Sequence, residues 1–256
     1  FLFLKSIGLI RNKIIVVFQA LSERRITMFK KSKINYLLVR YLLKSANIIL
    51  TLSNISKKIL KKEYKINNKK ILKIDFGVDQ SFWKYRKWEF KRKYLLSVGN
   101  DSNRDFDSLI KSVGKNYNLI IVTKKNFKCP PNIKIYNSVS EKKLRNLYQN
   151  ARITIIPSKK VYSENAGMSC IMQSMASGTP VITSNLGTLR EKFTNLENII
   201  FYKAGSASSL KDVLVNHYSN KKVLSKISSN AIKKIRYLYN YKNLSKKLNE
   251  KFKSLI

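Results

Sequence analysis

Short apolar runs alternate with longer stretches of helical periodicity along the first third of the chain. Three runs bounded by polar residues predict buried strands: 13–18, 47–52 and 70–75. The stretches between them predict helices at 33–46 and 53–64. The first of these helices carries four apolar residues at helical spacing: Leu37, Leu38, Tyr41 and Leu42. Strands that alternate with helices are typical of a parallel sheet with crossover helices.

The same alternation resumes after residues 81–93, which are rich in aromatic and basic residues and lack regular periodicity. Further apolar runs predict the strands of this second region: 94–98, 119–123, 133–136, 153–157, 181–183 and 199–202. The chain is therefore expected to hold two α/β regions joined by the irregular segment.

Polar residues predict where some of the helices begin. Ser140 followed by Glu141 is a helix start, since a hydroxyl side chain caps the first turn and an acid interacts favourably with its dipole. Ser208 or Ser209 is expected to cap a later helix in the same way. Residues 236–256 are predicted to form a last, basic helix.

The stretch 163–183 is a polar, glycine-containing loop that leads into a short helix and then an apolar strand. One face of this helix is apolar: Ile171, Met172, Met175 and Ala176. Gly178 suits the left-handed position after a helix end, and Pro180 cannot continue the helix. The strand at 151–157 delivers the loop at its carboxyl end, where open α/β sheets bind ligands. The free N–H groups of the helix start therefore predict a phosphate site.

Five segments of the chain resemble motifs of one enzyme family. Residues 173–182, Gln-Ser-Met-Ala-Ser-Gly-Thr-Pro-Val-Ile, resemble its E-A-M-A-x-G-x-P-V-I signature. Residues 76–79 resemble its G-V-D motif, and residues 95–110 resemble its V-G-R segment with the helix start that follows. Residues 139–148 resemble its V-S-x-E-E-L helix, and residues 239–248 resemble its closing Y-S-W-E helix. From about residue 45 to its end, the chain is identified on these motifs as a member of the GT-B glycosyltransferases, family 4 (glycosyl transferases group 1).

The resemblance implies an α/β fold of GT-B type, with two Rossmann-like parallel-sheet domains of which the first is incomplete. We expect the remainder of an N-terminal, acceptor-side domain at 1–82 and a linker at 83–93. A C-terminal, nucleotide-sugar-binding domain would follow at 94–235, and a helix at 236–256 would pack back on the N-terminal domain. A complete enzyme of the family is longer than 256 residues. The chain is therefore expected to be an N-terminally truncated fragment.

The function implied by the resemblance is retaining, metal-independent transfer of a sugar from a nucleotide-sugar donor to a glycan or lipid-linked acceptor in polysaccharide biosynthesis. The nucleotide sugar is a substrate, so no cofactor is expected. The acceptor half of the site would lie largely in the missing segment. The chain by itself is therefore expected to be inactive or nearly so.

The family's phosphate-binding basic residue corresponds to Arg104, four residues after the Gly99-Asn100 turn. Arginine offers fork geometry suited to phosphate oxygens. The alternative for Arg104 is a solvated arginine at a helix start. The family's other cation, in its V-G-R motif, is Asn100 here, which removes one positive charge from the expected site.

The family's E-x7-E pair falls on Gln173 and Asn165, with Glu164 one place upstream. The catalytic residue is left unknown, and Glu164 and Asn165 are candidates near the donor sugar. Gln173 can bind ribose hydroxyls through its amide, without charge assistance. The alternative is that these residues only cap the helix. The other donor-binding residues implied by the resemblance are a turn glycine, backbone N–H groups at the helix start and residues near the base: Gly99, Ala166, Gly167, Met168, Ser169, Thr123 and Val139.

The chain carries a formal net charge of +38, with 52 Lys and Arg against 14 Asp and Glu. Such a charge permits binding to nucleic acid or to an anionic membrane surface. The excess is spread along the chain, where Lys, Asn and Ile are plentiful, so we favour a composition bias of the source. We expect a cytoplasmic protein without a specific nucleic-acid partner, and peripheral contact at the inner face of the membrane stays open. The alternative function is that of a noncatalytic basic protein that binds such a membrane surface or nucleic acid.

Several other sites are not expected. Cys129 and Cys170 have no metal-ligand spacing and suggest no disulfide framework. His217, the single histidine, is predicted to be solvated, so neither a histidine-based triad nor a metal site is expected. The Val98-Gly99-Asn100 turn lacks the further glycines of a dinucleotide fingerprint.

Overall fold

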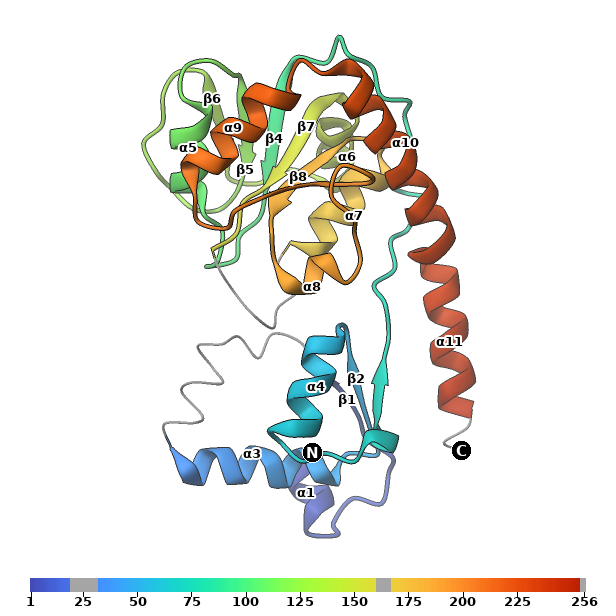
Figure 1. The fold of residues 1–256 in the computed structure, drawn as a ribbon. Helices are drawn as coiled ribbons and strands as arrows, with labels where there is room; N and C mark the ends of the chain where they lie inside the picture. The colour runs from blue at the N-terminus through green and yellow to red at the C-terminus, as the bar shows by residue number, and fades with distance from the viewer. Residues whose placement is uncertain (19–31, 160–166, 254–256) are drawn as a thin grey trace. The chain divides into compact units, whose positions relative to one another are not determined.

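The computed structural model describes residues 1–18, 32–159 and 167–253 (Figure 1). The chain divides into two compact units. The first contains residues up to Asp75 and the described residues from Leu244 onward, and the second contains the described residues between Phe76 and Asn243. Each unit is built on its own parallel sheet.

The sheet of the first unit has the order β1-β2-β3 and is parallel throughout its described part. The elements follow the predicted alternation: α1 (Leu2–Ser6), β1 (Ile15–Phe18), α3 (Lys33–Ser45), β2 (Ile48–Thr51), α4 (Asn54–Lys62), the 3₁₀ turn η1 (Asn68–Lys70) and β3 (Ile71–Lys73). Ser53 caps α4 by accepting a hydrogen bond from Ser56 N. The core of this unit includes Phe18, Ile49 and Leu60.

The periodicity of α3 identified the helix but not the face that packs on the core. Leu37, Leu38 and Tyr41 are all exposed. The core side of α3 instead contributes Leu43, with Tyr36 and Val39 packed partly against the cluster. Two apolar stripes lie on this helix, and helical spacing alone cannot say which one is buried.

The second unit contains a sheet of order β6-β5-β4-β7-β8-β9, in which every neighbouring pair is parallel. Its strands are β4 (Tyr94–Val98), β5 (Leu119–Val122), β6 (Ile133–Tyr136), β7 (Ala151–Ile156), β8 (Val181–Ser184) and β9 (Ile200–Tyr202). All lie where the sequence predicts them. The chain order runs outward from β4 in one direction and from β7 in the other, so the topological switch point lies between these two strands.

Helices cover both faces of this sheet (Figure 1). Its helices are α5 (Phe106–Val113), α6 (Glu141–Asn150), α7 (Met168–Ala176), α8 (Gly187–Arg190), α9 (Ala207–His217) and α10 (Lys221–Leu238). α5 packs beside α9, whereas α7 packs beside α6 and α10. The apolar face predicted for α7 is buried, and Gly178 adopts the left-handed conformation predicted after its end, with φ +86°.

Two helix predictions need correction. The cap of α9 is Ser206, which accepts from Ser209 N, and neither Ser208 nor Ser209 takes that role. Ser206, Ser208 and Ser209 are all candidate caps in the sequence, and the backbone of the turn after β9 places Ser206 at the cap position. The single helix predicted at 236–256 is divided, since α10 ends at Leu238 and α11 spans Tyr241–Lys253. Ser140 caps α6 as predicted.

The irregular segment after β3 is fixed to the second unit by hydrogen bonds. Val78 N donates to Tyr239 O at 2.8 Å, and Gln80 Nε2 donates to Ile235 O at 3.1 Å. Further along, the buried Arg92 guanidinium donates to Thr179 Oγ1 at 2.9 Å and to main-chain carbonyls. Burial, and to a lesser extent the charge of nearby Arg86, lowers the pKa of Arg92 to about 10. Residues 76–93 therefore form part of the second unit's framework.

Candidate functional site

Arg104 lies at the topological switch point, between the carboxyl ends of β4 and β7. Its Nε donates to Val98 O, the last residue of β4, at 3.2 Å. Its Nη1 lies 3.4 Å from Ser158 Oγ, just after β7, and 3.0 Å from Asp101 Oδ2. Only 4% of the residue is exposed, so the alternative of a solvated arginine is wrong. The guanidinium is fixed where α/β sheets bind their ligands.

Two glycines leave the space that the Arg104 side chain occupies. A Cβ atom built on Gly99 would overlap the Arg104 guanidinium, and one built on Gly167 would lie 3.2 Å from both Nη atoms. Gly99 has φ +150° and Gly167 has φ +77°, values that side chains with a Cβ rarely adopt. The Gly99 turn and the start of α7 therefore both lie against the same guanidinium.

The amino end of α7 supplies the amide groups that were predicted there. Gly167 is the N-cap residue and offers no side-chain cap, and Ile171 N is the first to donate back, to Gly167 O at 2.9 Å. The N–H groups of Met168, Ser169 and Cys170 belong to the turn that a helix leaves without intrahelical acceptors. Together with the Arg104 guanidinium, this turn places positive potential at the switch point.

A buried hydrogen-bond network joins the strand ends next to Arg104. Ser184 Oγ, at the end of β8, accepts from Ser158 N at 2.8 Å and lies 2.9 Å from the Tyr202 hydroxyl at the end of β9. Burial raises the pKa of Tyr202 to about 12, so the phenol stays neutral at physiological pH. The network links the ends of β7, β8 and β9 beneath the residue that contacts Arg104. No motif in the sequence pointed to Ser158, Ser184 or Tyr202 as part of the site.

Asn100 and Thr123 lie together at the ends of two neighbouring strands. Asn100 Oδ1 accepts from Lys124 N at 2.7 Å and from Thr123 Oγ1 at 3.3 Å, which ties the end of β4 to the end of β5. Asn100 therefore joins two strand ends by hydrogen bonds, and it does not supply the positive charge of the arginine that the family motif has at this position. Val139 lies half-buried in the turn that leads from β6 into α6.

Gln173, on α7, contacts a second group of residues away from Arg104. Its Oε1 accepts from the hydroxyl of Tyr148 at 3.4 Å. Tyr148 is fully buried and packs edge-on against Trp83 with ring centroids 5.7 Å apart. Burial raises the pKa of Tyr148 well above its usual range, so it remains a hydrogen-bond donor. A recess of about 220 Å³ opens beside Gln173 and is part of the second unit.

Three of the predicted residues, Glu164, Asn165 and Ala166, lie outside the described residues. They include both candidates for the catalytic role. The predicted donor-site residues that the structure describes fall mainly in two places. Gly99, Asn100, Arg104, Thr123 and Gly167 lie around the switch point, and Ser169 and Gln173 line the recess. Met168 is the buried first residue of α7.

Two further features were predicted differently or not at all. His217 is half-buried at the end of α9, and burial lowers its pKa, so the prediction of a solvated histidine is wrong. A larger cavity of about 690 Å³ lies at the carboxyl ends of β8 and β9, with Arg190 and Lys203 in its lining.

Within the described ranges, His, Cys, Asp and Glu form no group of three that could hold a metal ion. None of the described helices is both long and apolar enough to cross a membrane.

Comparison with known proteins defines the class to which this site belongs. The sequence profile of glycosyl transferases group 1 matches residues 86–234. The O-antigen chain mannosyltransferase RfbU of Salmonella typhimurium strain LT2 is 29% identical over 210 residues, which are 74% of this chain and 57% of RfbU. The matched family covers more than half of the chain. The chain belongs to the glycosyl transferases group 1 family.

Solved structures show the same fold at low sequence identity. HepE from Anabaena, in complex with UDP-glucose, has a TM-score of 0.81 at 13% identity, covering 99% of this chain and 76% of HepE. Sucrose-phosphate synthase from Thermosynechococcus elongatus has a TM-score of 0.79 at 14% identity, covering 94% of this chain and 67% of that enzyme. The fold is therefore of GT-B type, as predicted. The chain spans a little over half the length of RfbU, the curated relative that it matches.

Proposed function

We propose that the chain is the donor-binding part of a retaining glycosyltransferase that moves a sugar from a nucleotide sugar to a glycan or lipid-linked acceptor. The observation that carries the proposal is the position of Arg104, which lies between the Gly99 turn and the amino end of α7. A pyrophosphate bound there would meet a fixed guanidinium and the N–H groups of a helix start. Both are ligands that proteins use for phosphate.

The same arrangement favours the chemical step. Departure of a nucleoside diphosphate leaves negative charge on the leaving oxygen, and donors fixed in advance stabilise that charge without reorganisation. Arg104 is held by Val98 O, Ser158 Oγ and Asp101. In this proposal the cation and the helix dipole replace a metal ion, and the transfer is metal-independent.

The chain supplies one half of the proposed reaction centre. The acceptor-side domain, of which the first unit would be a part, would bind the acceptor and supply any catalytic side chain. The chain alone is therefore proposed to bind donor and to turn over little or none of it. RfbU is named as an O-antigen chain mannosyltransferase and HepE is solved with UDP-glucose, which supports a nucleotide-sugar donor and polysaccharide biosynthesis.

Binding of nucleoside diphosphates tests the proposal. Calorimetric titration with UDP and GDP should show affinity that Arg104→Ala lowers about 10- to 100-fold, the effect of losing hydrogen bonds of about 1.5–3 kcal/mol to a charged group. Arg236→Ala is the matched control, because Arg236 is an exposed arginine on α10 of the same unit. Circular dichroism should show that both variants fold. Equal affinity in Arg104→Ala and Arg236→Ala would refute a donor site at the switch point.

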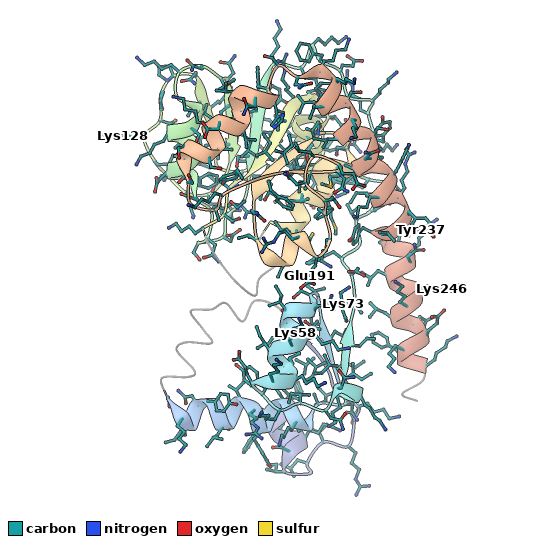
Figure 2. All side chains as sticks on the ribbon, viewed as in Figure 1. Lys58, Lys73, Lys128, Glu191, Tyr237 and Lys246 are labelled. Atoms are coloured by element: carbon teal, nitrogen blue, oxygen red, sulfur yellow. The ribbon has the colours of Figure 1, made fainter. Side chains whose placement is uncertain are left out.

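The charge of the chain supports a second candidate function. Basic side chains extend from many elements, as Lys58 on α4, Lys128 between β5 and β6, and Lys246 on α11 illustrate (Figure 2). A noncatalytic protein could use them to bind an anionic membrane surface at the inner face of the membrane, or nucleic acid. Binding to vesicles and to unrelated polyanions that weakens steeply with salt, without any affinity for UDP or GDP, would favour this alternative.

A further inference from the structure

The recess beside α7 combines a segment that precedes the second sheet with one side of the helix. It has a volume of about 220 Å³. Its lining comprises Phe76, Gly77, Val78, Asp79 and Trp83 from the segment, and Ser169, Met172 and Gln173 from α7. Every lining residue belongs to the second unit. The G-V-D motif at 77–79 thus reaches the predicted donor site, although the function proposed above gives it no role.

Three polar groups in this lining retain hydrogen-bonding capacity among the described residues. Asp79 Oδ1 accepts from Ser81 N at 2.8 Å and from Ser81 Oγ at 2.6 Å, whereas its Oδ2 makes no hydrogen bond to them. Gln173 uses Oε1 toward Tyr148, which leaves its Nε2 without a partner in that part of the chain. The Ser169 hydroxyl is also without one there. The lining therefore offers one acidic acceptor, one amide donor and one hydroxyl.

The rest of the recess is apolar and held in place. Trp83, Met172 and Val78 are buried. Val78 N donates to Tyr239 O, and Trp83 N donates to Asp79 O at 2.9 Å. The hydrogen bonds from Ser81 lower the pKa of Asp79, so its carboxylate is ionised at neutral pH. Asp79 is exposed, and its carboxylate is held by Ser81 on the segment that lines the recess together with α7.

These groups select one class of ligand. A carboxylate oxygen accepts hydrogen bonds from hydroxyl groups and repels phosphate, and a carboxamide nitrogen donates to hydroxyl oxygens. Two hydroxyls on adjacent carbons would satisfy both at once, and an apolar floor suits the carbon face of a sugar ring. The pyrophosphate of the donor would lie nearby, because Gly167 and Gln173 are less than two helical turns apart on α7.

We infer that Asp79 is a specificity residue that binds a vicinal diol of the nucleotide sugar across the recess from Gln173. This inference rests on the proposed function. Asp79 supplies a negative charge to the lining of the recess, to which Gln173 contributes an uncharged amide. The diol is either that of the ribose or that of the transferred hexose.

The test separates the charge of Asp79 from its structural hydrogen bonds. Asp79→Asn keeps an oxygen that can accept from Ser81 N, and it replaces the free Oδ2 by an amide NH2 group, which removes the negative charge and that acceptor. Titration with UDP, with 2′,3′-dideoxy-UDP and with UDP-glucose then distinguishes the two sources of the diol. Asp107→Asn is the matched control, because Asp107 is an exposed aspartate on α5. The double variant Asp79→Asn/Gln173→Glu returns a carboxylate to the recess from the helix side.

If the ribose supplies the diol, Asp79→Asn should weaken UDP about 10-fold and leave 2′,3′-dideoxy-UDP unchanged. If the hexose supplies it, only UDP-glucose should weaken. In either case the double variant should recover affinity, and the melting temperature should match that of Asp107→Asn. Unchanged affinity of Asp79→Asn for UDP and for UDP-glucose overturns the inference while leaving the proposed function intact. Absence of binding to all three ligands by the unaltered chain would instead overturn both.

Discussion

The terminal nitrogens of Arg104 lie 3.2 Å from the point where a Cβ of residue 167 would stand. Residue 167 is a glycine with φ +77°, and the space left by its missing side chain is shared with Ile156. This close approach brings the guanidinium against the amino end of α7. The glycine is therefore required both by backbone conformation and by the position of the cation.

Replacing Gly167 with alanine should affect stability and binding together. A left-handed backbone costs a residue with a Cβ about 1–2 kcal/mol, and contact with Ile156 and Arg104 adds to this cost. Gly205→Ala is the matched control, since Gly205 has φ +74° but nothing within 4 Å of a built Cβ. Thermal denaturation should show a larger loss for Gly167→Ala, and UDP affinity should fall in that variant alone. Equal melting temperatures and affinities would contradict the close packing at Gly167.

Arg104→Lys should separate the charge of Arg104 from its shape. Lysine keeps one positive charge but cannot hold Val98 O, Ser158 Oγ and Asp101 at the same time as a phosphate, because its ammonium is a single point of contact. The affinity for UDP should lie between that of the unaltered chain and that of Arg104→Ala. Calorimetry on the three proteins measures this order. A lysine variant that binds as tightly as the unaltered chain would show that charge alone suffices.

The buried phenol of Tyr202 predicts a loss of stability at alkaline pH. Burial raises its pKa to about 12, above the value of about 10 in an unfolded chain. Between these values the unfolded chain releases a proton that the native chain keeps. The contribution of Tyr202 is therefore complete below pH ~10 and is lost as the pH rises toward ~12.

Chemical denaturation between pH 9 and 12 checks this contribution. Tyr202→Phe should be less stable at neutral pH, by about 1 kcal/mol for the lost hydrogen bond to Ser184, but its stability should fall less steeply with pH. Tyr237→Phe, which alters an exposed tyrosine, serves as the control. Identical slopes for Tyr202→Phe and Tyr237→Phe would mean that Tyr202 is not the titrating group.

Removal of divalent ions should leave donor binding unchanged. The proposed site meets the pyrophosphate with Arg104 and the amino end of α7, so EDTA should not alter the dissociation constant for UDP. Added Mg²⁺ should have no effect beyond that of matched ionic strength. Titrations in EDTA and in Mg²⁺ measure this directly. A tenfold gain in affinity with Mg²⁺ would show that the donor binds as a metal complex.

The fold was largely predictable because its signals are local. The strands from β4 to β9 coincide with apolar runs, and Ser140 and Gly178 mark helix ends through their own side-chain and backbone preferences. Such preferences act within a few residues of the chain. Local preference could not identify which serine caps α9 or which apolar stripe of α3 is buried. In both cases the answer depends on tertiary packing.

The candidate site was predictable in its residue types and less so in its contacts. The resemblance placed Arg104, Gly167 and Gln173 in one family site, and the structure gives the first two a common position. The resemblance could not show that Arg104 is buried and held by Asp101 and Ser158, because these contacts join separate turns after different strands.

The sequence by itself determined the alternation of elements, the two-region organisation and the family, since periodicity and short motifs can be recognised without knowledge of distant contacts. Only the tertiary structure brought Asp79 and Gln173 to one recess and linked Ser184 to Tyr202 beneath the switch point. The physical reason is that a parallel sheet gathers the carboxyl ends of strands that are remote in sequence. The identity of those neighbours depends on strand order and side-chain packing.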